Sequence, residues 1–121
     1  MMKNPTFWIS TLTAARGFRT LVQQERKIRL ALAVTVIVIG LAVWLRTSYL
    51  ETLLLLVVCI QVIVGETVNT SLEKAMDYAS GMAFHPLIKR GKDYAAASVF
   101  LLSVLASIVS LVILARRYFS A

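Results

Sequence analysis

Residues 52–80 read TLLLLVVCIQVIVGETVNTSLEKAMDYAS, an uncharged apolar run that continues directly into an acidic segment. The run from Thr52 to Gly65 has the composition of a transmembrane helix, but it is shorter than the roughly 20 residues that cross a hydrocarbon core. It spans a membrane only if Glu66, with or without Asn69, lies within or at the edge of the bilayer. This stretch therefore predicts a membrane fold and an acidic side chain at membrane depth.

The whole chain has the composition of a membrane protein. Of its 121 residues, 59% are hydrophobic, and the mean hydropathy is +0.78, which is more apolar material than a small soluble core can bury. The length leaves no room for a separate nucleotide-binding module, so we expect residues 1–121 to form a single integral-membrane domain. A net charge of +7 fits anchoring against anionic lipid head groups, and we expect no nucleic-acid partner.

Three uncharged stretches of helical length predict three transmembrane helices, at about residues 28–46, 50–70 and 94–115. Before the first span, basic and apolar residues are mixed in a way that is typical of an amphipathic helix on the membrane surface, over about residues 8–27. Downstream, Gly81 and Pro86 indicate that the acidic helix ends near Ala79–Met82. The predicted fold is therefore all-α, with an N-terminal surface helix followed by three spans.

The basic residues predict the orientation of these spans. The N-terminal flank and the loop before the third span would lie on one side of the membrane. That side would carry Lys3, Arg16, Arg19, Arg26, Lys27, Arg29, Lys74, Lys89, Arg90 and Lys92. The other side would carry only Arg46, Arg116 and Arg117. Because basic residues concentrate in cytoplasmic loops, the first side is expected to be cytoplasmic.

The polar residues of the acidic segment share one helix face. At 100° per residue, Glu66, Asn69, Glu73 and Asp77 fall in a stripe about 16 Å long. For Glu73, a solvated helix face is an equal alternative to a functional role, and for Asp77 the solvated helix face is the favoured interpretation. Glu66 differs, because a carboxylate at membrane depth costs at least a few kcal/mol. It needs a cation, either from a Lys or Arg of a neighbouring segment or from a bound divalent ion such as Mg²⁺. We interpret it as a functional residue that accepts a proton from a substrate hydroxyl.

A second polar group precedes the third span, in HPLIKRGKDYAAA, residues 85–97. Lys89, Arg90 and Lys92 either anchor the chain at the cytoplasmic face or cradle a polyphosphate. Asp93 is expected at the start of the third span, where a carboxylate favours the helix dipole. The chain contains neither a P-loop nor the glycine-rich loop of protein kinases, so a kinase built from it would be of neither familiar soluble kind.

Together these segments resemble the small prokaryotic diacylglycerol kinase family, one branch of which phosphorylates undecaprenol. The resemblance rests on QQERKIRLALAV, which contains Glu25, followed by GETVNTSLEKAMDY and then by HPLIKRGKDYAAASV. Their order, their spacing and the three-span topology match over roughly residues 14–115. Members of the family are homotrimers with a surface helix before three spans, and their sites lie between subunits.

The resemblance also implies roles for individual residues. Glu66 matches the proposed catalytic base of the family, and Glu25 and Glu73 match the carboxylates that hold Mg²⁺ on ATP. The remaining matches lie in the nucleotide site: Lys92, Asp93, His85, Asn69 and Asp77.

The expected function is therefore ATP-dependent phosphorylation of a lipid hydroxyl, from diacylglycerol to phosphatidic acid, with undecaprenol as the alternative acceptor. The protein is expected in the bacterial inner membrane, with its N-terminus and active site on the cytoplasmic side. A second alternative is a non-enzymatic transporter or regulatory subunit, in which Glu66 would couple to protons or cations. A transporter would need a polar residue facing Glu66 from another span. The first and third spans offer only Thr35, Ser98, Ser103, Ser107 and Ser110.

Overall fold

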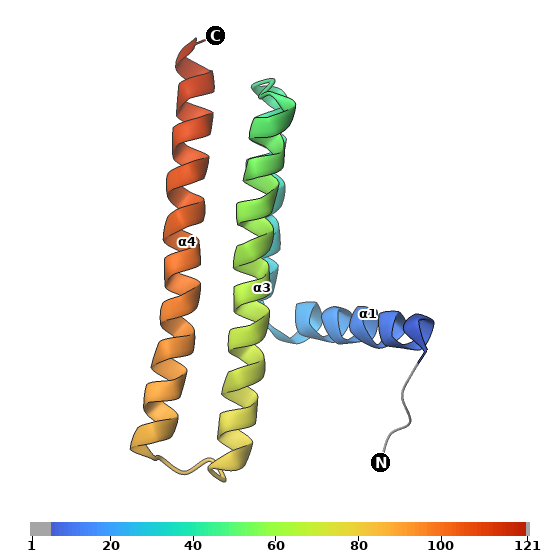
Figure 1. Ribbon diagram of the computed structural model, residues 1–121, viewed down its shortest axis with the longest axis vertical. Coiled ribbons are helices and arrows are strands. Elements are labelled where there is room, and N and C mark those ends of the chain that lie inside the picture. The colour runs from blue at the N-terminus through green and yellow to red at the C-terminus, as the bar shows by residue number, and fades with distance from the viewer. Residues whose placement is uncertain (1–5, 121) are drawn as a thin grey trace.

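The computed structural model describes residues 6–120, which form helices without any strand in that range. The elements in chain order are α1 (Phe7–Gln24), α2 (Arg26–Trp44), α3 (Tyr49–Ala79) and α4 (Pro86–Ser120). Figure 1 shows α3 and α4 side by side and antiparallel, α2 behind α3, and α1 projecting sideways from the bundle. Three of these helices are long and apolar enough to cross a membrane, namely α2, α3 and α4. The predicted all-α membrane fold is confirmed.

Helix α1 ends earlier than the sequence suggested, because the chain turns at Glu25. This residue has an extended backbone, with φ −112° and ψ 113°, and separates α1 from α2. Arg29 stabilises the corner, since its guanidinium donates to the carbonyl oxygens of Val22 and Gln23 at 2.8 and 2.9 Å. A cation at this end of a helix also suits the helix dipole.

No residue of α1 is buried, and the apolar side chains of Phe7 and Trp8 are 89% and 67% exposed. This open apolar surface agrees with a helix that lies on a membrane. Lys3, which entered the orientation argument, lies outside the described residues.

A capping box fixes the turn between α2 and α3. The Ser48 hydroxyl accepts from the backbone N–H of Glu51 at 3.1 Å, and the Glu51 carboxylate accepts from the N–H of Ser48 at 2.9 Å. The preceding Arg46 has a left-handed backbone, with φ 58°. These bonds satisfy two donors that a helix start otherwise leaves free, so α3 has a defined first residue at the end of the bundle opposite to the acidic stripe.

We expect Ser48→Ala to lower the free energy of unfolding by about 1 kcal/mol, because it removes the acceptor for the Glu51 N–H. The measurement is equilibrium unfolding in detergent, followed by helical circular dichroism. Thr11→Ala is the matched control, because its hydroxyl bonds only to a carbonyl of its own helix, that of Phe7. An unfolding curve for Ser48→Ala that coincides with that of the control would contradict the assigned capping role.

Few side chains are buried between the helices of the bundle, and most large apolar side chains face outward. Ala42, Leu55 and Ile113 form a small buried cluster among α2, α3 and α4. In contrast, the side chains of Phe100 and Leu111 on α4 are 66% and 69% exposed. Such outward apolar surface is stable against lipid tails rather than water.

Gly65 brings α4 close to α3 beside Glu66. A Cβ atom on Gly65 would lie 2.6 Å from Cδ1 of Leu102, so a larger residue would require the Leu102 side chain to move. The absence of a side chain on Gly65 thus leaves room for a side chain of α4 next to Glu66.

The predicted end of the acidic helix is confirmed, whereas the predicted position of Asp93 at the start of the third span is not. Helix α3 ends at Ala79, as expected, and the following Gly81 has φ 62°, a left-handed conformation that glycine adopts readily. The expectation that Asp93 lies at a helix start is wrong, because α4 begins at Pro86 and has no acidic residue in its first turn. Proline fits that first position, since its fixed φ is helical and its missing N–H is not needed there.

Candidate functional site

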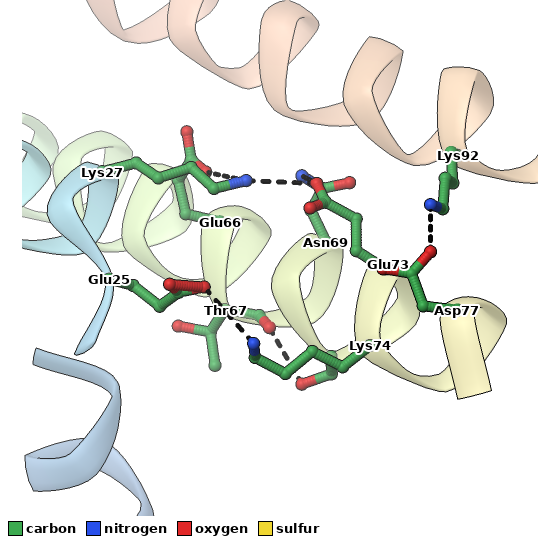
Figure 2. Close-up of polar contacts among 10 residues, drawn as sticks. Glu25, Lys27, Glu66, Thr67, Asn69, Glu73, Lys74, Asp77 and Lys92 are labelled. Atoms are coloured by element: carbon green, nitrogen blue, oxygen red, sulfur yellow. Dashed lines mark hydrogen bonds and ion pairs between the residues drawn. The ribbon is translucent and has the colours of Figure 1, made fainter. Parts of the chain in front are cut away.

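The polar residues of α3 form the predicted stripe, and it faces the neighbouring helices. Figure 2 shows Glu66, Asn69, Glu73 and Asp77 in succession along α3, with the start of α2 near Glu66 and α4 running alongside α3 to Lys92. Asn69 is buried, and its Nδ2 donates to Oε1 of Glu73 at 2.8 Å. The sequence interpretation that these side chains share one face therefore agrees with the structure, and the amide orients one carboxylate of the stripe.

Lys27 supplies the cation that Glu66 needs. Its Nζ lies 3.1 Å from Oε1 of Glu73 and 3.8 Å from Oε2 of Glu66, and the Glu66 side chain is only 16% exposed. Figure 2 shows the lysine reaching from the start of α2 to both carboxylates. Sequence reasoning counted Lys27 only among the basic residues expected on the cytoplasmic side. The signal that could have identified it was the requirement for a compensating cation near Glu66.

Two further ion pairs at or beside the stripe also use a lysine. Nζ of Lys92, on α4, pairs with Oδ1 of Asp77. This ion pair joins α3 to the cationic segment of residues 85–97, which the sequence predicted to contact nucleotide. Glu25, at the corner between α1 and α2, lies 3.9 Å from Nζ of Lys74. The structure thus brings Glu25, from before the first span, close to the acidic half of α3 (Figure 2).

The two remaining predicted residues stand apart from this cluster. Nδ1 of His85 accepts from the N–H of Leu87 at 3.1 Å, so the histidine rather than Asp93 caps the start of α4. Asp93 pairs with Lys89 one turn earlier, at 2.8 Å, with both side chains about 60% exposed. Within residues 6–120, no hydrogen bond or ion pair joins either residue to Glu66 or Glu73.

An apolar groove of about 540 Å³ opens beside this cluster, between α2, α3 and α4. Lys27 and Glu66 line one end of it, and aliphatic or small residues such as Val34, Ala106 and Leu111 line the rest. The residues of α2 in the groove run from position 27 to 38, a helical length of about 16 Å. The groove can hold a hydrocarbon chain with a polar end beside the Glu66 carboxylate.

The sequence profile described as prokaryotic diacylglycerol kinase matches residues 12–114, which is most of the chain. The chain belongs to the prokaryotic diacylglycerol kinase family. Its curated relatives include a diacylglycerol kinase of Helicobacter pylori strain 26695, which is 39% identical over 75 residues, covering 62% of this chain and 58% of the relative. The diacylglycerol kinase of strain J99 is 35% identical over 82 residues, covering 68% of this chain and 63% of the relative. The matched region thus spans less than two thirds of either relative.

Kinases of the kind after which this family is named transfer a phosphoryl group from ATP, a reaction that generally needs a divalent metal ion. Oxygen donors that suit such an ion lie together at Glu73 and at the buried Oδ1 of Asn69, which has no hydrogen-bond partner, whereas the carboxylate of Glu25 pairs with Lys74. Among residues 6–120, no three His, Cys, Asp or Glu side chains gather closely enough to hold a metal by themselves. A divalent ion held here would therefore need water or phosphate oxygens to complete its shell.

Proposed function

We propose that this chain is a lipid kinase that transfers the γ-phosphoryl group of ATP to the hydroxyl of a membrane lipid. The acceptor that we propose is diacylglycerol, which would become phosphatidic acid, and undecaprenol is the alternative. The observation that carries the proposal is the position of Glu66 at the end of the apolar groove. Family membership and the names of the two relatives support the same chemistry.

Glu66 is the general base in this proposal. An acceptor whose hydrocarbon lies in the groove would present its hydroxyl to the Glu66 carboxylate. The carboxylate takes the hydroxyl proton as the oxygen attacks the γ-phosphorus, a new P–O bond forms, and the bond to the β,γ-bridging oxygen breaks. ADP then leaves with that bridging oxygen. Such a reaction depends mainly on positioning and charge neutralisation, and little covalent chemistry is required of the protein.

The other polar residues would bind the nucleotide and its metal. Glu25 and Glu73 would hold Mg²⁺, which neutralises charge on the phosphates. The residues on the nucleotide side would be Asn69, Asp77, His85, Lys92 and Asp93. The ion pair of Lys92 with Asp77 supports this arrangement, because it keeps a phosphate-binding cation beside the stripe before nucleotide arrives.

The setting of the enzyme is also part of the proposal. We infer one domain over residues 1–121 in the bacterial inner membrane, with its N-terminus and site on the cytoplasmic side. A homotrimer is proposed because the groove is open along the bundle and a second copy would help to enclose it.

Labelled ATP identifies the acceptor. Purified protein in detergent micelles should receive ATP labelled in the γ-phosphate, with short-chain diacylglycerol and undecaprenol in parallel. We expect label in phosphatidic acid at the higher rate. A higher rate with undecaprenol would assign the alternative branch. A proton or cation flux in vesicles without any labelled lipid would support the transporter instead.

A substitution that narrows the groove should weaken binding of the lipid without affecting binding of ATP. We expect Ala106→Phe to raise KM for diacylglycerol about tenfold, because the ring would fill space that the hydrocarbon needs, while KM for ATP stays unchanged. Ala115→Phe is the matched control, because Ala115 is exposed on the same helix outside the groove. If both variants keep the wild-type KM for lipid, the hydrocarbon does not bind in this groove.

A further inference from the structure

Lys27 is a cation at a position where helix geometry disfavours one. It is the second residue of α2, and the first turn of that helix contains no acidic side chain. The start of a helix carries the positive end of its dipole, and Arg26 adds a further cation beside Lys27. Apart from Glu25 at the N-cap, the local sequence offers no anionic group to offset these two cations, so contacts from elsewhere in the fold help to stabilise the ammonium group.

These contacts come from the two carboxylates on which the proposed chemistry depends. The ammonium group lies 3.1 Å from Oε1 of Glu73 and 3.8 Å from Oε2 of Glu66. The neighbouring lysines are engaged elsewhere, Lys92 with Asp77 and Lys74 with Glu25. Within residues 6–120, Lys27 is the one Lys or Arg that forms an ion pair with Glu66 or Glu73.

The oxygen of Glu73 that Lys27 contacts accepts two hydrogen bonds in total, one from Lys27 and one from Asn69. Oε1 accepts from Nζ of Lys27 at 3.1 Å and from Nδ2 of Asn69 at 2.8 Å. A divalent ion that bound this oxygen would lie close to the ammonium group, and two cations at such a distance repel each other strongly in a half-buried site. The metal and the lysine therefore compete for Glu73.

We propose that Lys27 is the resident counter-ion of this site and that a divalent metal ion must displace its ammonium group from Glu73. The inference rests on the proposed function only in that Glu73 is taken as a metal ligand. The displaced ammonium stays beside Glu66, where the phosphates of a bound nucleotide offer it a new anionic partner. Lys27 thus weakens binding of the metal alone and favours binding of the metal together with nucleotide.

Binding of Mn²⁺ to the nucleotide-free protein in detergent tests this inference. Mn²⁺ takes the same oxygen ligands as Mg²⁺, and free Mn²⁺ is measured by electron paramagnetic resonance. We expect Lys27→Met to bind Mn²⁺ about tenfold more tightly than the wild type, equivalent to about 1.4 kcal/mol. Lys27→Arg, which keeps the charge, should bind Mn²⁺ like the wild type. With saturating ATP, the difference between Lys27→Met and the wild type should shrink.

Arg116→Met is the matched control for net charge, because Arg116 is exposed at the opposite end of the bundle. Circular dichroism establishes that each variant is folded, and Lys27→Gln removes the same charge if Lys27→Met does not fold. The inference is overturned if loss of the Lys27 charge leaves Mn²⁺ affinity unchanged or undetectable, or if Lys27→Arg or Arg116→Met tightens it equally. Because the measurement needs no turnover, it is independent of whether the wild type phosphorylates lipid, which is the separate test of the proposed function.

Discussion

Glu66→Gln is expected to lower kcat for lipid phosphorylation by about 10²- to 10⁴-fold. The amide keeps the size of the side chain but cannot take the proton of the acceptor hydroxyl. Because the amide would still line the groove and the nucleotide residues are untouched, KM for lipid and for ATP should change little. Steady-state rates with short-chain diacylglycerol, at several concentrations of each substrate, give the separate effects.

The matched control for this variant is Glu51→Gln, the same chemical change at the other end of α3. Glu51 caps that helix through the Ser48 N–H, and an amide oxygen can accept the same bond. Its kcat should equal that of the wild type. The base assignment fails if Glu66→Gln and Glu51→Gln have equal kcat, or if Glu66→Gln raises KM and leaves kcat unchanged.

Glu73→Gln is expected to change the metal requirement of the enzyme. Loss of a metal-ligand carboxylate should raise the Mg²⁺ concentration for half-maximal rate at least tenfold and up to about 100-fold, since even outer-shell changes cost this much metal affinity. The measurement is rate against Mg²⁺ concentration at fixed ATP. In Glu73→Gln, the amide of Asn69 would also lose the charged acceptor of its 2.8 Å hydrogen bond, and this loss should further weaken metal binding.

Glu66→Gln and Glu73→Gln should therefore be distinguishable. Excess Mg²⁺ should restore part of the rate of Glu73→Gln and none of the rate of Glu66→Gln. If excess metal restores both variants equally, or neither, the assigned division of roles between base and metal ligand is wrong.

The number of spans and the acidic stripe were accessible from the sequence because both depend on local patterns. Uncharged runs of helical length define α2, α3 and α4, and spacings of three and four residues place Glu66, Asn69 and Glu73 on one face. The end of α3 at Ala79 followed from Gly81 in the same way. These features need only the neighbours of each residue along its own helix.

Features that depend on contact between helices were missed. The pairing of Lys27 with Glu66 joins residues on two helices, and the groove exists only because three helices pack around it. Asp93 was misplaced because the charged segment from Pro86 onward lacks the apolar pattern of a span, although it continues the same helix. The turn at Glu25 was also missed, because it is stabilised by Arg29 reaching back to α1.

Transfer of label from γ-labelled ATP to lipid, by wild type and Glu66→Gln under identical conditions, tests the central claim most directly. Both proteins should be placed in bilayer discs that contain diacylglycerol, and the lipid should be extracted and counted. The account predicts labelled phosphatidic acid with the wild type and almost none with Glu66→Gln. Equal labelling by the two proteins, or an unlabelled lipid fraction with a folded wild type, would contradict it.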